Sequence, residues 1–265
     1  MGEAQQRAGA FFGRRKGKKL RSGQDDLIQN LLPAIRVVPG SAPASQFPNR
    51  QARETWLEIG FGGGEHLAHQ ARTHPDINVI GCEPFVNGMA KLLAAIDHEK
   101  LDNIRVWDDD VTKLLPTLPD RSFDRVYILY PDPWPKRRQR KRRLVSDEML
   151  DTLARVMKPG AELRFASDID DYIGWVLARA LRSDHFRWTA QRADDWRKPY
   201  EGWPGTRYEA KAIREGRVPS YLTFVRVWPR SGDRFVVQGG RKRRMRHFAR
   251  AAIEGCSVAP MSSPP

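Results

Sequence analysis

Short apolar runs alternate with amphipathic segments over most of the chain. Runs such as TWLEI and FDRVYILY are each followed by a stretch whose apolar residues recur every three or four positions, as in a helix. This alternation predicts an α/β fold with a doubly wound, mostly parallel, seven-stranded sheet. The expected strands are TWLEI, INVIGCE, NIRVW, FDRVYILY, AELRFAS, FRWTA and SYLTFVRVW, and the expected helices cover residues 24–36, 65–72, 85–97, 111–115, 147–157, 169–181 and 206–216.

The two ends of the chain lack this pattern. Residues 1–22 are rich in Gly, Arg and Lys, and residues 39–50 have the composition of a linker. We therefore expect residues 1–50 to form a basic, partly disordered arm with one short helix, and residues 51–229 to form the folded domain. Residues 230–265 show no core-forming pattern and are expected to be a basic, disordered tail.

Positive charge is concentrated in three short runs. The chain carries 46 Lys and Arg against 32 Asp and Glu, a net charge of +14. Residues 14–21, 136–143 and 241–246 contain 18 of the basic residues and no acidic residue, so the rest of the chain is mildly acidic, at −4. Basic patches on an otherwise acidic body indicate a polyanion partner such as a nucleic acid.

Other features of the composition exclude several classes of protein. The two cysteines, Cys82 and Cys256, are too few for a disulfide framework or a Cys-rich zinc site and fit a reducing cytoplasm. No apolar run approaches the roughly 18 residues of a transmembrane helix, and the N-terminus lacks the apolar stretch of a signal peptide. A cytoplasmic protein without membrane attachment is therefore expected.

A glycine-rich turn follows the first strand of the expected domain. In Glu58-Ile59-Gly60-Phe61-Gly62-Gly63-Gly64, a carboxylate ends the strand and glycines let the backbone approach a ligand closely. A dinucleotide fingerprint would need Gly at position 65, where this chain has Glu65, and an acid at a helix N-terminus opposes a pyrophosphate. S-adenosylmethionine, which has no phosphate and carries a cationic amino end, fits this turn better than NAD.

Acidic residues also follow the second and third strands. Glu83 is placed to accept hydrogen bonds from a ribose diol, and Asp110 comes within reach of an adenine amino group. Asp108 and Asp109 are alternatives for the adenine role that spacing alone does not decide. Three acids in register at strand ends support a nucleoside-containing ligand.

A proline-framed aspartate follows the fourth strand. In Tyr130-Pro131-Asp132-Pro133-Trp134-Pro135-Lys136, alternate prolines favour a stiff, extended path that would place Asp132, Trp134 and Lys136 on one side. A carboxylate, an aromatic plane and an ammonium group together suit a purine. The basic run that starts at Lys136 indicates contact with an RNA or DNA backbone.

The chain resembles the bacterial tRNA (guanine-N7-)-methyltransferases, the TrmB-type family of class I S-adenosylmethionine-dependent methyltransferases, in LEIGFGGGEHL, GCEPF, DDDVTKLL, YPDPWPKRRQRKRR, RFASDIDDY and TRYEAKA. The resemblance spans about residues 55–228 and implies the Rossmann-like sheet of that class. It implies S-adenosylmethionine contacts from Glu58, Gly60, Gly62, Gly64, Glu83, Asp110 and Asp132, with Asp132 also catalytic. It implies substrate contacts from Lys136, Asp168, Thr206, Arg207, Tyr208 and Glu209, and tRNA contacts from Arg138, Arg140, Lys141, Arg142 and Arg143. The expected partner is tRNA, with no metal and no obligate protein partner.

The resemblance further implies transfer of a methyl group to N7 of a guanine in the variable loop of tRNA. Because N7 carries a lone pair and no proton, in-line attack on a sulfonium methyl needs no general base, and positioning dominates. We expect Asp132 to hold the guanine by accepting hydrogen bonds from its N1–H and amino group. The alternatives are another nucleic-acid methyltransferase and a noncatalytic RNA-binding protein on the same scaffold.

Several of these residues also have structural interpretations. Thr206 and Glu209 form the T-x-x-E pattern of a capping box, and Asp168 stands where it could cap the helix over residues 169–181. The resemblance favours substrate binding over capping for all three. The histidines at 66, 69 and 74 do not have the H-E-x-x-H spacing of a metal site and are expected on a helix surface. Of the tryptophans, Trp56, Trp107 and Trp188 are expected in the core, and Trp134 is expected at the pocket.

Overall fold

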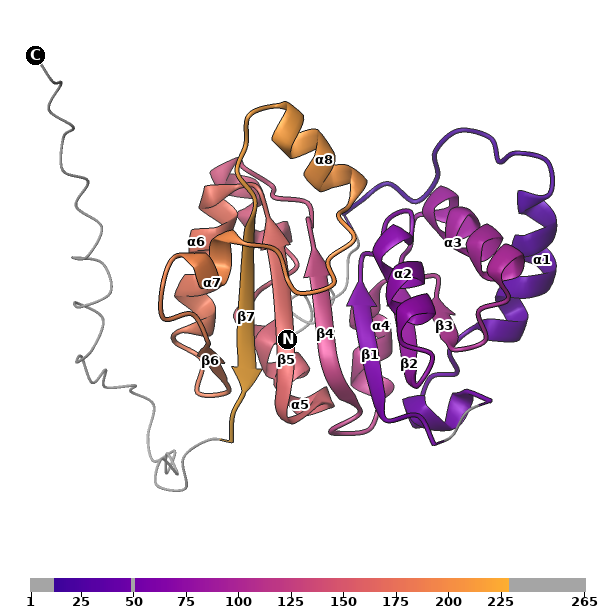
Figure 1. Cartoon of the computed structure of the whole chain (residues 1–265), viewed down its shortest axis with the longest axis horizontal. Coiled ribbons are helices and arrows are strands. Elements are labelled where there is room, and N and C mark those ends of the chain that lie inside the picture. Colours follow the sequence, from indigo (N-terminus) through magenta and orange to yellow (C-terminus); the bar gives the residue numbers. More distant parts are fainter. Residues whose placement is uncertain (1–11, 49–50, 229–265) are drawn as a thin grey trace, which may run out of the picture. The chain divides into compact units, whose positions relative to one another are not determined.

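The computed structural model describes residues 12–48 and 51–228, in which seven strands form one sheet (Figure 1). The strand order is β3–β2–β1–β4–β5–β7–β6. Strands β1 to β5 pair in parallel, whereas β7 runs antiparallel to both β5 and β6, so the expected mostly parallel sheet is confirmed. The strands are β1 (Glu54–Ile59), β2 (Ile77–Cys82), β3 (Ile104–Trp107), β4 (Phe123–Leu129), β5 (Met157–Ser167), β6 (Phe186–Trp188) and β7 (Ser220–Arg226).

The order of the strands fixes where a ligand binds. From β1 the chain moves outward to β3 and then returns to β4 on the other side of β1. The connections after β1 and β4 therefore diverge, and they leave a crevice at the carboxyl ends of these two strands. This edge of the sheet carries the glycine-rich turn after β1 and the proline-framed aspartate after β4.

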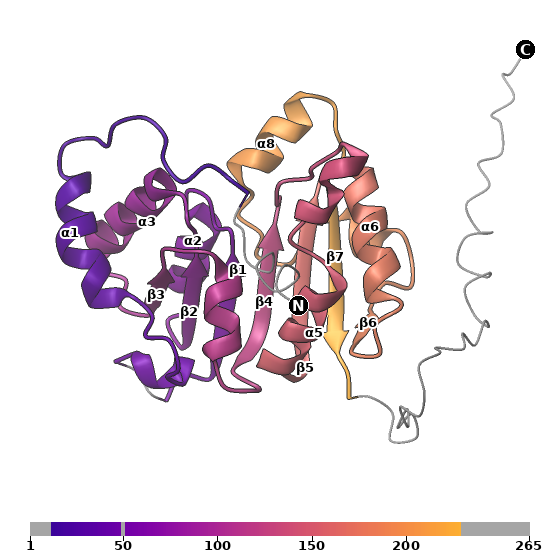
Figure 2. The same ribbon diagram turned by 180° about the vertical axis from the view of Figure 1, so that it is seen from behind.

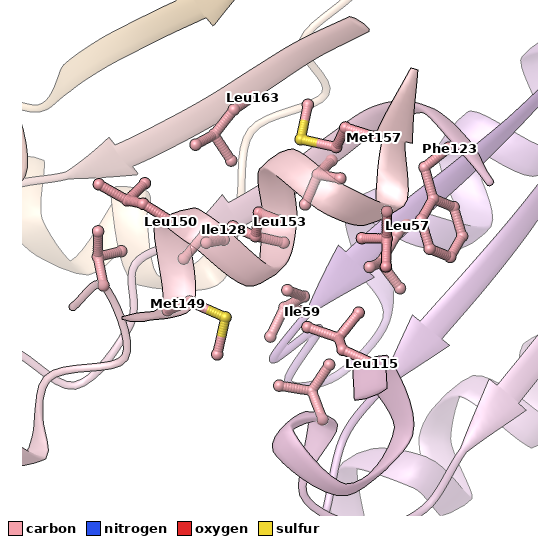
Figure 3. Packing of buried hydrophobic residues seen from close by; sticks show 14 of the residues in the cluster. Leu57, Ile59, Leu115, Phe123, Ile128, Met149, Leu150, Leu153, Met157 and Leu163 are labelled. Carbon is pink, nitrogen blue, oxygen red and sulfur yellow. The ribbon is translucent and has the colours of Figure 1, made fainter. Parts of the chain in front are cut away.

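Helices cover both faces of the sheet, as Figures 1 and 2 show from opposite sides. Alternate residues of β1 serve two separate cores, as the two-residue repeat of a strand requires. Leu57 and Ile59 pack with Leu153 of α5 (Figure 3), whereas Trp56 packs with Leu92 of α3. The α-helices are α1 (Gln24–Ile35), α2 (Glu65–Thr73), α3 (Val86–Glu99), α4 (Val111–Leu114), α5 (Asp147–Val156), α6 (Asp170–Ala180), α7 (Asp194–Arg197) and α8 (Arg207–Arg214), and the 3-10 helices are η1 (Pro43–Gln46), η2 (Leu115–Thr117) and η3 (Arg137–Arg142).

The folded body extends further toward the N-terminus than residue 51. Leu32 of α1 is buried in the core that contains α2 and α3. Val37 and Phe47 are buried in the opposite core, and the amide of Val37 donates to the carbonyl of Val106 at 2.8 Å. The helix expected over residues 24–36 is therefore present, but it belongs to the body because its apolar face needs a cover.

The structure and the sequence pattern differ mainly at element ends. β5 begins at Met157, well before the AELRFAS run, because Met157 pairs with Phe123 beside a register shift.

Trp56 is buried, and Trp107 and Trp188 pack partly buried against the core, as expected. No helix in residues 12–48 or 51–228 is long and apolar enough to cross a membrane. The expected tail, with its basic run at 241–246, lies outside the described residues.

Candidate active site

The glycine bend after β1, residues 60–64, is built for close backbone packing. Gly60, Gly62 and Gly64 have φ values of 75°, 59° and 80°, which L side chains rarely adopt. A Cβ added to Gly88 of α3 would lie 2.0 Å from the carbonyl oxygen of Gly62, so α3 packs directly on the bend. Nothing lies within 4 Å of a Cβ built at Gly60, so space opens beside that residue.

Glu58 and Glu83 flank this bend in buried positions. Glu58 is 3% exposed, and its carboxylate is hydrogen-bonded to Nδ1 of His66 at 2.7 Å. Glu83 accepts hydrogen bonds from the amides of Gly62 at 2.7 Å and Phe85 at 3.0 Å. Burial raises the pKa of Glu83 above its ordinary value, and the negative charge of Asp132 adds to the rise.

The burial of His66 corrects the expectation of a surface histidine. The side chain of His66 is 2% exposed, and its Nε2 lies 3.1 Å from the side-chain amide nitrogen Nε2 of Gln70. If Gln70 donates to Nε2, the Nδ1 proton of His66 points at Glu58, which orients that carboxylate. The signal in the sequence was the spacing of His66 and Gln70 on the same helix face as Leu67 and Ala71, which are buried. No group of acidic, His or Cys side chains in the described residues is arranged to hold a metal.

The structure separates the three consecutive aspartates after β3. Asp108 is ion-paired with Arg36 at 2.6 Å, and Asp109 is ion-paired with Arg15 and Lys113, each at 2.7 Å. Partial burial acts to raise the pKa of Asp109, but hydrogen bonds from these two cations lower it to about 2. Asp110 instead caps α4 by accepting from the amide of Thr112 at 2.9 Å.

Asp110 therefore differs from its two neighbours in charge balance. No ion pair reaches its carboxylate from residues 12–48 or 51–228. Its side chain keeps acceptor capacity beyond the single capping bond. Of the three alternatives for the adenine contact, Asp110 is the one whose charge is not already compensated by a cation.

The proline-framed segment after β4, residues 130–136, forms a bent elbow. Tyr130 and Trp134 have φ values of 49° and 41°, so the expectation of a wholly extended path is wrong at these two residues. Left-handed backbone at non-glycine residues costs about 1–3 kcal/mol each and persists only where surrounding contacts impose it. Here the chain turns away from β4 and then turns again into η3.

Asp132 lies exposed at the centre of this elbow. Its carboxylate has no hydrogen bond or ion pair to any described residue, and its negative charge adds to the rise in the pKa of Glu83. The elbow and the glycine bend line one pocket, to which Tyr130 and Gly60 contribute, whereas Asp132 lies outside its lining. The pocket beside them is lined by Glu58, Gly60, Phe61, Glu65, His66, Leu129, Tyr130, Thr206 and Tyr208.

The N-terminus of α8 closes one side of this pocket. Thr206 and Glu209 form both hydrogen bonds of a capping box, at 3.1 Å and 3.2 Å. Glu209 also accepts from the indole of Trp203 at 2.7 Å and from the hydroxyl of Tyr221. Residues 207 and 208 approach the bend, because a Cβ at Gly62 would lie 3.2 Å from the ring of Tyr208 and 3.3 Å from Arg207.

Asp168 does not cap α6, which corrects the structural interpretation of that residue. The N-cap of α6 is Ile169, which makes no side-chain capping bond, and the helix begins at Asp170. Asp168 is instead ion-paired with Arg217, which follows α8. The pair ties the end of β5 to the segment that leads into β7.

The basic segment after the elbow divides between surface and interior. Lys136, Arg138 and Lys141 are exposed, and Arg142 lies over the rings of Trp134 and Phe12 at 5.0 Å and 4.9 Å. Arg140 is ion-paired with Asp171 at 2.7 Å, and the side chain of Arg143 is 0% exposed. The interior position of Arg143 leaves no surface for the RNA contact expected of it.

An N-terminal strap, residues 12–18, crosses this edge of the sheet and was not foreseen from the sequence (Figure 1). The carbonyl of Arg15 accepts from the amide of Val86 at 3.0 Å, and the amide of Gly17 donates to Asn87 at 2.7 Å. At its start, Phe12 packs edge-on against Trp134 with ring centroids 6.5 Å apart. The strap thus links the segments that follow β2 and β4.

Known proteins of one family are similar to this chain over most of its length. A family model described as putative methyltransferase matches residues 52–220. The chain is 55% identical over 221 residues to the tRNA (guanine-N(7)-)-methyltransferase of Chelativorans sp. (strain BNC1), covering 82% of this chain and 95% of that protein. It is 56% identical over 221 residues to the protein of the same name from Agrobacterium fabrum, with the same coverage. Among solved structures, 16S rRNA methyltransferase KamB is similar, with 20% identity and a TM-score of 0.49 over 68% of this chain and 90% of that chain.

Proposed function

The chain belongs to the tRNA (guanine-N(7)-)-methyltransferase family, and from this premise we propose that it transfers a methyl group from S-adenosylmethionine to N7 of a guanine in the variable loop of tRNA. The observation that carries the residue assignments is that the elbow and the glycine bend line one pocket, and that the Asp132 carboxylate in this elbow is not paired with any described residue. A negative charge there suits a reaction in which positive charge passes from sulfur to a purine ring.

The residues around the bend fit S-adenosylmethionine, which supplies a methyl group on a positively charged sulfur. Open space beside Gly60 gives the ligand room against the backbone. Glu58, oriented by His66, faces the pocket and suits the cationic amino end. Each oxygen of Glu83 accepts one backbone hydrogen bond and retains a lone pair for a ribose hydroxyl. Asp110 is assigned to the adenine amino group.

Asp132 acts on the guanine rather than as a base. Guanine N7 has a lone pair and needs no deprotonation, so the carboxylate serves to hold the base by its N1–H and amino edge. Its charge also offsets the positive charge that grows on the ring during transfer. Asp168 and α8 border the same edge, and Arg207 and Tyr208, positioned by the Thr206–Glu209 capping box, are assigned to the substrate.

The exposed basic residues are assigned to the tRNA backbone. Lys136, Arg138 and Lys141 present their charges to solvent beside the elbow, and Arg140 and Arg142 lie partly exposed in the same segment. These side chains orient the RNA on its phosphates, whereas the target base is selected at Asp132. A tRNA substrate and the scarcity of cysteine support a cytoplasmic location, and the proposed reaction uses no metal and no obligate protein partner.

The test is the Asp132→Asn variant of the full chain with unmodified tRNA and S-adenosylmethionine. Loss of the charge is expected to lower kcat about 100-fold, because removing one preorganised electrostatic group typically costs that much. S-adenosylmethionine binding, followed by calorimetry, should persist. The matched control is Asp97→Asn at the far end of α3, where Lys100 is the ion-pair partner of Asp97 among the described residues. The kcat of this control should equal that of the unmodified chain.

Three results would contradict parts of the proposal. Normal turnover by Asp132→Asn would remove the assigned role of that residue. A methylated nucleoside other than 7-methylguanosine would identify a different nucleic-acid methyltransferase. Failure of the unmodified chain to bind S-adenosylmethionine would favour a noncatalytic RNA-binding protein.

A further inference from the structure

Arg143 is buried although it ends the most basic stretch of the described chain. Its guanidinium lies 4.9 Å from the ring centroid of Tyr172 and 4.9 Å from that of Trp175, both on α6. It is ion-paired with the carboxylate of Asp171 on the same helix. Its Nε donates a hydrogen bond to the carbonyl of Pro133 at 2.7 Å. Four groups thus surround this one side chain.

The bond to Pro133 matters because the elbow has few other attachments. Residues 131, 133 and 135 are prolines and have no amide proton to donate. Within the part of the chain that the structure describes, no backbone hydrogen bond of residues 131–135 appears besides the one that the Pro133 carbonyl accepts. The carbonyl held by Arg143 belongs to the residue directly after Asp132, between the two left-handed turns at Tyr130 and Trp134.

We propose that Arg143 is a positioning residue for Asp132: it holds the elbow through the Pro133 carbonyl and so fixes the position of the neighbouring Asp132 carboxylate. This inference rests on the proposed function, in which Asp132 holds the guanine. Asp171 and the two aromatic rings fix the guanidinium in turn, so the elbow is anchored to the first turn of α6.

The contacts require arginine rather than lysine. A guanidinium is planar and has donors in several directions, so it can stack between two rings while it donates from Nε to a carbonyl and from Nη2 to a carboxylate. An ammonium group on a flexible stem keeps the charge but cannot make all of these contacts at once. Arg143→Lys therefore loosens the elbow without removing charge from the basic segment.

The experiment compares Arg143→Lys with two matched controls in the full chain. Arg226→Lys changes another buried arginine, which donates from Nε to the Ala154 carbonyl at 3.0 Å and stacks on Trp228 at 4.8 Å, on a strand end away from the pocket. Lys141→Ala removes an exposed charge from the same basic segment as Arg143. The measurements are kcat, KM for tRNA and its salt dependence, and Tm.

Arg143→Lys is expected to lower kcat 10- to 100-fold, since a displacement of about 1 Å at a reacting group can cost 100-fold. KM for tRNA and the salt dependence of tRNA binding should stay unchanged, so the kinetic effect is expected in kcat alone. Arg226→Lys should lower Tm comparably while keeping kcat, and Lys141→Ala should weaken tRNA binding and reduce its salt dependence. A kcat ratio close to one for Arg143→Lys, or an effect confined to tRNA binding, overturns the proposal.

A second variant guards against loss of folding. Asp171→Asn removes the negative charge of the half-exposed partner of Arg143 and leaves the buried Arg143 side chain unchanged. This variant should therefore fold, and its kcat should fall by less than that of Arg143→Lys. Unchanged kcat in this variant also overturns the proposal. Absence of 7-methylguanosine with the unmodified chain would instead refute the proposed function, which separates the two failures.

Discussion

Replacing Thr206 by alanine tests whether the α8 capping box acts on stability or directly on substrate. The Thr206 hydroxyl accepts from the amide of Glu209, and the Glu209 carboxylate accepts in return from the amide of Thr206. Loss of an N-cap hydroxyl typically costs about 1 kcal/mol, with a range of about 0.5–2 kcal/mol. For a body of this size, about 1 kcal/mol corresponds to a Tm lower by roughly 2–4 °C.

Glu209→Ala should cost more than Thr206→Ala. Glu209 accepts from the Trp203 indole and the Tyr221 hydroxyl in addition to the capping amide. Leaving the buried Tyr221 hydroxyl without its acceptor costs about 1–3 kcal/mol, and losing the two part-buried bonds from Trp203 and Thr206 adds about 0.5–1.5 kcal/mol each, so we expect a loss above about 2 kcal/mol. Thr206→Ser, which keeps the hydroxyl, is the matched control and should behave like the unmodified chain.

Urea unfolding followed by circular dichroism measures these changes, and tRNA titration of the same samples measures binding. If the hydroxyl serves the helix, Thr206→Ala lowers the free energy of unfolding, and any change in tRNA affinity is small at temperatures well below Tm. The reasoning is refuted if Thr206→Ala leaves the free energy of unfolding unchanged while tRNA affinity falls. The hydroxyl would then be a substrate ligand, as the family resemblance implies.

Two further predictions concern pH and salt. Burial raises the pKa of Glu83, so the protonated form of Glu83 is favoured in the folded chain. As the pH decreases, S-adenosylmethionine affinity should therefore begin to fall at a pH above about 4.3, the ordinary pKa of a glutamate. The affinity of Glu83→Gln, measured by calorimetry, should not show this pH dependence. The same shift means that Glu83→Gln gains stability relative to the unmodified chain as pH rises through the raised pKa. Truncation after Trp228, which removes the basic run at 241–246, should weaken tRNA binding and flatten its salt dependence, and an unchanged slope would show that the tail does not touch phosphate.

The strands were predictable because they are short apolar or alternating runs, and the central parallel strand β2 is buried along its whole length. Each run proposed as a strand overlaps one of the seven observed strands, and each has a buried core residue, from Trp56 in β1 to Phe224 in β7. The direction of β7 was not predictable in this way, because side-chain alternation is the same for parallel and antiparallel pairing. The packing of α1 on α3 was likewise invisible, since an apolar helix face shows that a cover exists but not which element supplies it.

The parts of the site that are formed by residues adjacent in the sequence were predictable. The glycine bend, Glu83 and the Asp132 elbow each follow a strand directly, and the edge rule for parallel sheets brings them together. The contacts of the strap join segments that are distant in the sequence, whereas the His66–Glu58 bond joins two residues across the glycine bend whose side-chain directions the sequence does not show. For Asp108 and Asp109, too, the deciding partners Arg36 and Arg15 lie far away in sequence.

The basic segment shows how local geometry divides a run of like charges. A 3-10 helix has about three residues per turn, so side chains three apart lie on one face. In η3 and the residue after it, Arg140 and Arg143 share the face toward Asp171, whereas Arg138 and Lys141 share a face exposed to solvent. Seven basic residues in the sequence therefore do not make seven phosphate contacts. Arg138 and Lys141 on the exposed face should contribute to the salt dependence of tRNA binding together with Lys136, Arg140 and Arg142, whereas Arg143 holds the elbow in place.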